Sequence, residues 1–210
     1  LRPQSGKSWV LILANPQDKF YVGSMSYDFS VDNFNDLFTN KTLTNVTALL
    51  SAMPMTAGVV VNAPPFVNKM LPMSYLSEAT EGINVNTKIG TSTVPLELTR
   101  AVAKIVVKST VADFTLSGIH SVYNMNKNTV LHNLSGNLET AASMVDYIRN
   151  DANEDFVSAT ANVTDPIYVY EAKSGTGAYM IIRAFYKGLE SYYKIAIADD
   201  ELKYIDIKRN

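Results

Sequence analysis

A regular series of short β-rich segments toward the C-terminus constrains the fold of this chain most strongly. The segments are 167–171, which alternates aliphatic and aromatic residues, 179–186, which is a β-rich run, and 192–198 and 204–208, which alternate again. The turn Lys187-Gly188 and the acidic run Asp199-Asp200-Glu201 separate the last three segments. A period of two is typical of a β-strand with one buried face, and tight turns join antiparallel neighbours. These segments therefore predict an antiparallel meander.

The preceding part of the chain also reads as β-structure. The apolar runs 9–14 and 58–62 are closed by prolines, which is typical of strands buried on both faces. The segments 96–108 and 113–123 change their apolar face midway, which indicates a bulge or a passage between sheets. Four small or β-branched residues of the first of these segments should be buried in a sheet-to-sheet core. They are Ala101, Ala103, Ile105 and Val107.

Two stretches show helical periodicity. Apolar residues at 43, 46, 49, 50 and 53 form a stripe that Pro54 ends. A second stripe runs from Leu138 to Ile148, with Asn137 as its N-cap. We expect two short helices, each covering a sheet edge.

Composition limits the chemistry of the chain more than its fold. Hydrophobic residues make up 47% and charged residues 18%, so a sizeable core can be buried. The net charge of −2 gives no electrostatic reason to expect a nucleic-acid partner, and no apolar run approaches the roughly 20 residues of a transmembrane helix. Cysteine is absent, which excludes disulfides, thiol nucleophiles and cysteine-bound metals. We expect no enzymatic activity, no cofactor and no metal site.

A polar stretch at 150–165 predicts the domain boundary. It suggests an N-terminal β-sandwich domain at 1–150 and a C-terminal one at 151–210. About 60 residues are few for an independent sandwich, because a small domain buries a smaller share of its surface. The second domain is therefore expected to be incomplete.

Several segments, taken in order, resemble one family. They are Leu71-Pro72-Met73-Ser74, the run from Leu96 to Ile105 (LELTRAVAKI), Ile167-Tyr168-Val169-Tyr170-Glu171, Tyr192-Tyr193-Lys194-Ile195, and the terminal run from Ile205 to Asn210 (IDIKRN). This order is similar to that of the fimbrillins of Bacteroidales surface fimbriae, the type V pilins. The Leu-x-Arg-Ala-Val-Ala-Lys stretch is the most specific piece.

The resemblance implies a fold and a function. The chain would form two transthyretin-like β-sandwich domains, be exported as a lipoprotein precursor, and lie in a fimbrium at the outer membrane. Its partners would be other fimbrial subunits, joined by donor strand exchange, and host or bacterial surface ligands. Family members continue past the Arg209-Asn210 pair, so we expect an open sheet edge. Trimming by an arginine-specific protease makes Arg2 the candidate processing site.

Two other classes of function compete with a fimbrial subunit. A surface carbohydrate-binding module would need an exposed, coplanar row of tyrosines for stacking against sugar rings. Alternatively, the tyrosines pair across strands and stabilise the sheet. A β-sandwich hydrolase would need two carboxylates facing each other in a cleft.

A few polar residues have both a functional and a structural interpretation. Arg100 and Lys104 would share one strand face, either contacting a neighbouring subunit or a ligand, or lying in solvent. His120 and His132 could hold a metal only with nearby acids, and we expect satisfied structural histidines instead. The run Asp199-Asp200-Glu201 is expected to be a solvated hairpin turn rather than a calcium site.

Overall fold

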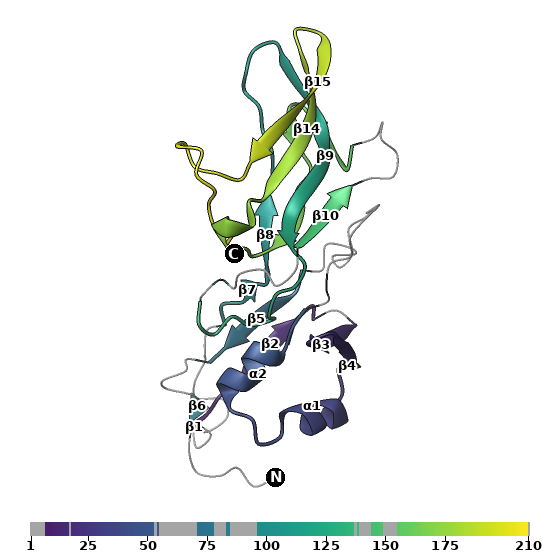
Figure 1. Ribbon diagram of the computed structural model, residues 1–210. Helices are drawn as coiled ribbons and strands as arrows, with labels where there is room; N and C mark the ends of the chain where they lie inside the picture. Colours follow the sequence, from purple (N-terminus) through teal and green to yellow (C-terminus); the bar gives the residue numbers. More distant parts are fainter. Residues whose placement is uncertain are drawn as a thin grey trace. The chain divides into compact units, whose positions relative to one another are not determined.

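The computed structural model describes residues 7–16, 18–52, 54, 71–77, 83–84, 96–136, 138, 144–148 and 155–209. The chain divides into two compact units. The N-terminal unit comprises the described residues within Leu1–Ala52, Leu71–Ala101 and Val130–Leu134, and the C-terminal unit those within Met53–Met70, Val102–Thr129 and Ser135–Asn210. Every strand pair in the described residues is antiparallel (Figure 1). The predicted mostly-β, antiparallel class is therefore confirmed.

The N-terminal unit contains short strands and two helices. Its elements are β1 (Lys7–Ser8), β2 (Leu11–Ala14), β3 (Lys19–Val22), β4 (Met25–Asp28), α1 (Val31–Phe38), α2 (Leu43–Leu49), β5 (Met73–Leu76), β6 (Ile83–Asn84) and β7 (Thr99–Arg100). The described strands form a three-stranded sheet in the order β2-β5-β7 and two pairs, β3-β4 and β1-β6.

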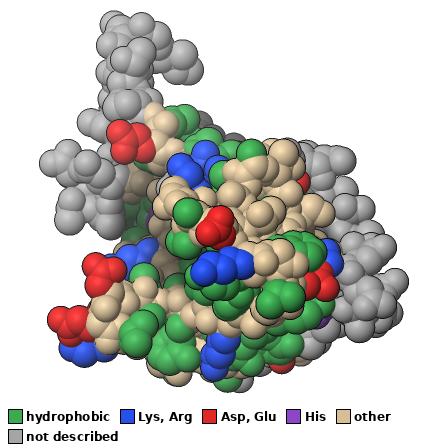
Figure 2. All heavy atoms as spheres, turned by 90° about the horizontal axis from the view of Figure 1, so that it is seen from above, with side chains coloured by type: hydrophobic (Ala, Val, Ile, Leu, Met, Phe, Trp, Pro, Cys, Tyr) green, Lys and Arg blue, Asp and Glu red, His purple; other side chains and the backbone are tan. Residues whose placement is uncertain are grey.

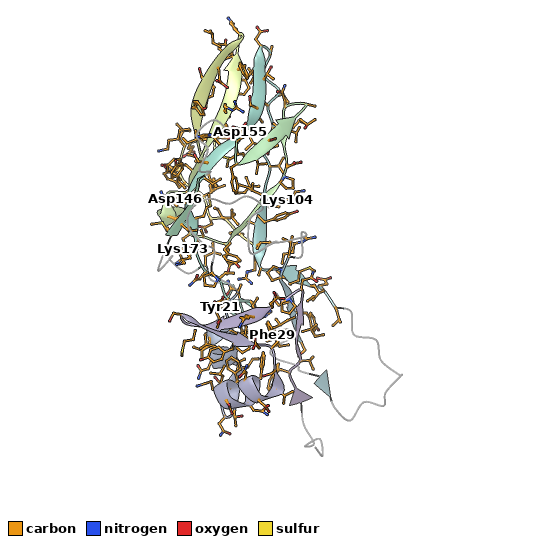
Figure 3. All side chains as sticks on the ribbon, turned by 90° about the vertical axis from the view of Figure 1, so that its right-hand side faces the viewer. Tyr21, Phe29, Lys104, Asp146, Asp155 and Lys173 are labelled. Atoms are coloured by element: carbon orange, nitrogen blue, oxygen red, sulfur yellow. The ribbon has the colours of Figure 1, made fainter. Side chains whose placement is uncertain are left out.

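An aromatic cluster is the core beside α1. Phe20 of β3 is fully buried, and its ring centroid lies 4.8 Å from that of Phe34 and 5.1 Å from that of Phe29, labelled in Figure 3. Phe34 and Phe38 share a helix face because they are four residues apart. The helix begins at a capping residue, since the Ser30 hydroxyl accepts a hydrogen bond from the Asn33 N–H at 3.1 Å.

The C-terminal unit contains the longer strands. Its elements are β8 (Val102–Ile105), β9 (Phe114–Asn126), β10 (Met144–Ile148), β11 (Val157–Thr160), β12 (Val163–Thr164), β13 (Ile167–Tyr170), the 3-10 helix η2 (Ser174–Thr176), β14 (Tyr179–Tyr186) and β15 (Leu189–Ala196). Among described residues, a six-stranded sheet has the order β12-β11-β9-β14-β15, with β10 pairing β9 on the side opposite β14. Strands β13 and β8 form a second sheet.

The core of the C-terminal unit combines alternate residues of both sheets. In β14, Met180, Ile182 and Ala184 are buried, and their neighbours on the other face are not. Other buried core residues of these sheets include Leu116, Ile119, Val122 and Met125 of β9, Val102 and Ala103 of β8, and Ile167, Val169 and Tyr170 of β13. Because β13 also contacts β9, the arrangement is that of a sandwich whose two sheets share one apolar layer.

Most of the predicted strands are confirmed. β2, β9, β13 and β14 lie at their expected places, and β15 overlaps the expected 192–198 but runs from Leu189 to Ala196. The segment 58–62 lies outside the described residues. The segment 96–108 breaks at Ala101 into β7 and β8, which belong to different sheets. Of the two alternatives that its change of phase indicated, a bulge or a passage between sheets, the structure shows the second. Ala101 and Ala103 are buried, but Ile105 and Val107 are only half-buried. The segment 204–208 forms isolated bridges rather than a strand.

One of the two predicted helices is confirmed. α2 matches the first stripe but ends at Leu49. The prediction of a helix up to Ile148 is wrong at 144–148, which form β10. Val145 is buried there because β10 pairs with β9, so tertiary pairing overrides a local helical pattern. Asn137 and 139–143 lie outside the described residues.

The two units differ from the predicted domains at 1–150 and 151–210. β14 pairs with β9 from Tyr179↔Tyr123 to Tyr186↔Phe114, so strands from both sides of residue 150 share one sheet. Between the described residues, the chain passes from one unit to the other after Ala101, at 130 and at 135. A polar stretch indicates a surface loop, and a loop can connect two strands of a single sheet.

Candidate functional site

β15 is an edge strand of the six-stranded sheet (Figure 1). It pairs with β14 along its whole length, from Tyr179↔Ala196 to Tyr186↔Leu189. No strand in the described part of the chain pairs with its other side. An edge strand of this length presents a row of backbone N–H and C=O groups that can pair with another chain.

The register identifies which backbone groups of β15 point outward. Just past the strand, the Ile197 N–H donates to the Ala178 carbonyl at 3.0 Å, which continues the β14–β15 ladder. In an antiparallel ladder, residues bonded to one neighbour alternate with residues whose backbone groups point the other way. The outward set therefore consists of Glu190, Tyr192, Lys194 and Ala196.

The side chains of β15 are exposed on both faces of the sheet. On the core side, Leu189 is 74% exposed and Ile195 is 38% exposed. On the opposite side, Tyr192 is 51% exposed and lies between Glu190 and Lys194, which are also exposed. Figure 2 views the molecule from above the view of Figure 1 and shows hydrophobic side chains among acidic and basic ones. The edge thus combines apolar surface with one charge of each sign.

An ion-pair cluster fixes β14 and β15 on the outer face of the sheet. Arg183 of β14 donates to both carboxylate oxygens of Asp155, at 2.9 and 2.8 Å, and to Glu190 at 2.9 Å. The Asp155 side chain, labelled in Figure 3, is only 4% exposed. Its hydrogen bonds raise the pKa of Arg183 above the usual value, so Arg183 stays charged at every pH that a folded protein meets. Glu190 is thereby held in place at the open edge.

Gly118 lets β9 pass close beneath this cluster. A Cβ atom on Gly118 would lie 2.2 Å from the Val157 carbonyl oxygen and 2.8 Å from an Asp155 carboxylate oxygen. No real Cβ atom tolerates such a distance from a backbone atom. Glycine is therefore required at 118 because of close packing, not because of its backbone angles.

The tyrosines of the outer face pair across strands. Tyr123 and Tyr179 are register partners in β9 and β14, and their rings stack at 4.7 Å with 12° between planes. The Lys194 ammonium lies 4.1 Å from the Tyr179 ring centroid, and Tyr192 packs edge-on against His120 at 4.9 Å. These contacts favour the structural interpretation, because stacked rings do not form the coplanar row that sugar binding requires.

β2 is a second open edge, in the N-terminal unit. The Ser77 N–H donates to the Val10 carbonyl at 3.1 Å, so the outward backbone groups belong to Leu11 and Leu13. All side chains of β2 are apolar and half-buried. Among described residues, no strand covers its outer side. This edge differs from β15 in carrying no charge.

A buried ion pair anchors the C-terminal segment of the chain. Arg209 donates from Nε to Glu171 Oε2 at 2.8 Å and from Nη2 to the other Glu171 oxygen and to Thr129. Arg209 and Glu171 are both about nine-tenths buried. Nearby, Ile207 pairs with Ala172. Two segments of the fimbrillin-like pattern meet here, a contact that no local sequence signal predicted.

The structure separates the predicted basic pair. Arg100 lies in β7 and Lys104 in β8, with the chain broken at Ala101 between them. The prediction that they share one strand face is therefore wrong, although both side chains are exposed. Arg2, the candidate processing site, lies outside the described residues.

The two histidines lie in different units. His132 contacts the Ser74 hydroxyl at 3.0 Å, and this hydroxyl donates to the Leu131 carbonyl at 2.9 Å, so His132 is the satisfied structural histidine that was predicted. His120 packs against Tyr192, but its Nδ1 has no hydrogen-bond partner among the described residues. The prediction for His120 is thus not confirmed in its hydrogen bonding.

The acidic run forms the expected exposed turn. The Asp199 carboxylate accepts hydrogen bonds from the backbone N–H groups of Glu201 at 3.0 Å and Lys203 at 2.9 Å. Within the described ranges, no group of three or more His, Asp or Glu side chains is placed to hold a metal ion. In the same residues, no helix is long and apolar enough to cross a membrane.

Comparison of the chain with protein-family models, curated proteins and solved structures finds no match. The similarity to fimbrillins therefore rests on the sequence segments alone.

Proposed function

We propose that this chain is a structural subunit of a bacterial cell-surface fimbrium that assembles by β-strand exchange and supports adhesion. The observation that carries the proposal is the β2 edge. Its backbone groups at Leu11 and Leu13 point outward, and its apolar side chains are only half covered. Such an edge is a template for an added strand from another chain.

Strand addition at β2 would combine two effects. The outward N–H and C=O groups of Leu11 and Leu13 would bond to the donor backbone, which gives affinity. Alternate donor side chains would cover the apolar surface beside Ile12, because side chains along a strand point to opposite faces. Val10, next to the strand, is 37% exposed and would extend the covered surface.

The sequence resemblance supports the remaining parts of the proposal. They are two transthyretin-like domains, export as a lipoprotein precursor, a place at the outer membrane, and cleavage by an arginine-specific protease at Arg2. Sequencing the N-terminus of the protein from native filaments tests the last part. A native start well upstream of Arg2 would exclude that site.

Immunogold electron microscopy of the parent cell surface tests the function directly. Antibody raised against this chain should label filaments along their length for a stalk subunit, or at one end for a tip or anchor subunit. Filaments without label would contradict the proposal. Binding of the purified chain to a glycan array without any filament label would favour a carbohydrate-binding module instead.

A further inference from the structure

We propose that β15 pairs antiparallel with β15 of a second copy of this chain, with Tyr192 on the two-fold axis. The contact would extend the six-stranded sheet continuously across two molecules. This inference stands apart from the fimbrial proposal, because it rests on β15 rather than β2. It concerns the chain in solution, whatever larger assembly it enters.

The backbone of β15 permits few registers. Only Glu190, Tyr192, Lys194 and Ala196 direct N–H and C=O groups outward, so hydrogen-bonded pairs between two copies must join members of this set. With Tyr192 facing Tyr192, the Glu190 residue of each copy faces Lys194 of the other. All three pairs then exchange backbone hydrogen bonds.

Side-chain chemistry selects this register on both faces of the sheet. On the outer face, Glu190 of each copy lies directly opposite Lys194 of the other copy. Opposite charges in that position stabilise a sheet. On the core side, the exposed Leu189 side chain of each copy lies opposite the exposed Ile195 side chain of the other copy. The strand is therefore complementary to itself in both charge and apolar surface.

The neighbouring registers lack this complementarity. With Lys194 on the axis, two ammonium groups would face each other. With Tyr193 on the axis, Glu190 of one copy would face Ala196 of the other. With Ser191 on the axis, Glu190 would face Tyr192. Like charges directly opposite destabilise a sheet, and the other two registers leave the charges unpaired.

Contacts within each copy already restrict the conformations of the charged side chains before the two copies associate. Glu190 is bonded to Arg183, and the Lys194 ammonium lies over the Tyr179 ring. Side chains that are already positioned lose less conformational freedom on association. A two-fold contact of this kind closes after two copies and cannot extend a filament by itself. It would instead join two subunits side by side.

A charge exchange tests the pairing. Sedimentation of the purified chain over a range of concentrations should show a monomer–dimer equilibrium. Lys194→Glu should weaken dimerisation about tenfold, because two attractive pairs become repulsive. The double variant Glu190→Lys with Lys194→Glu should recover part of the lost affinity, because the two opposite-charge pairs return while the Glu190–Arg183 ion pair is lost. Lys104→Glu, the same charge change at an exposed site in the other sheet, is the matched control and should leave the dimer unchanged.

Engineered cysteines test the register, since the chain has no cysteine of its own. Tyr192→Cys places two thiols opposite each other across the axis, with Cα atoms about 5.5 Å apart, within disulfide range. Lys194→Cys places its two thiols four residues apart along the strands, about 13 Å. Mild oxidation should therefore crosslink the first variant and not the second, with thermal unfolding confirming that both are folded.

Three results would overturn the proposal. The chain could stay monomeric at every concentration with no crosslink at Tyr192→Cys. Both cysteine variants could crosslink at the same rate, which would refute the register. Finally, a monomeric chain could take up a synthetic strand peptide along β15, which would show that the edge accepts a different occupant.

Discussion

β2 and β15 are both edge strands with outward backbone groups, but their side chains differ. β2 carries four apolar, half-buried residues and no charge. β15 carries exposed residues of both kinds, with an acid and a base placed symmetrically about Tyr192. An apolar edge accepts any strand of suitable shape, whereas a self-complementary edge selects its own copy. Similar backbone geometry thus supports two different partners.

The largest expected effect comes from proline substitution in β2 or in β15. Each substitution should abolish one kind of assembly and leave the other intact. Leu13→Pro removes an outward N–H from β2 and should abolish filament formation while leaving the β15 dimer intact. Tyr192→Pro should abolish the dimer and leave filaments intact. Proline is tolerated where the N–H faces away from the sheet, so both variants should fold.

The proline pair is measured by two methods. Negative-stain microscopy after treatment with an arginine-specific protease reports filaments, and sedimentation reports the dimer. If Leu13→Pro polymerises normally, β2 is not the acceptor edge. If Tyr192→Pro still dimerises, the β15 contact is refuted while the fimbrial proposal stands.

The next effect concerns the ion pairs that position Glu190 at the edge. Arg183→Leu removes the two hydrogen bonds that Arg183 donates to the buried Asp155 carboxylate, which should destabilise the C-terminal unit by about 3 kcal/mol. Hydrogen exchange should accelerate in β14 and β15 but not in β2. Lys104→Leu, at an exposed cation of the same unit, is the control and should have little effect. Equal acceleration in β2 would show that the two edges are not independent.

A smaller loss is expected from Gly118→Ala. The added methyl would overlap the Val157 carbonyl, so β9 and β11 must separate, at a cost of about 2 kcal/mol. Gly175→Ala has open space around its Cβ and should be nearly neutral. Chemical denaturation measures both variants. Unchanged stability in Gly118→Ala would mean that the close approach of β9 and β11 is not needed to support the β15 edge.

The smallest expected effect is a difference in salt dependence between association at β15 and strand addition at β2. Raising sodium chloride from about 0.05 to 0.5 M screens the exposed Glu190–Lys194 pairs, so the dimer should weaken about threefold. Strand addition at the uncharged β2 edge should be insensitive to the same change. A dimer unaffected by salt would show that backbone and apolar contacts dominate β15.

Local patterns predicted the strands better than they predicted their partners. β14 has the predicted bounds because its buried and less buried residues alternate, and α2 follows a regular apolar stripe that Pro54 ends. β10 was mistaken for a helix, because Val145 and Ile148 also fit helical spacing. α1 and the β3–β4 hairpin were not predicted, since two four-residue strands are too short for a clear period.

The open edges show a similar limit. The strand 192–198 was expected, yet its place at the edge of the sheet depends on the pairing of β14 with β9. The same pairing brings Asp155 against Arg183 and Tyr123 against Tyr179. Each of these partners is distant in sequence, and neither residue of a pair carries a local signal for the other.

By itself, the sequence determined the mostly-β class, the change of apolar face within 96–108 and the acidic turn after β15, because period, phase and turn residues act locally. Only the tertiary structure decided which strands are neighbours, where the two units divide, and which of the described strands lie at a sheet edge. Those outcomes depend on how distant apolar faces are buried together and on which backbone groups then lack a partner. The sequence places Glu190 and Lys194 symmetrically about Tyr192. This symmetry can direct pairing with a second copy only because β15 lies at an edge of the sheet.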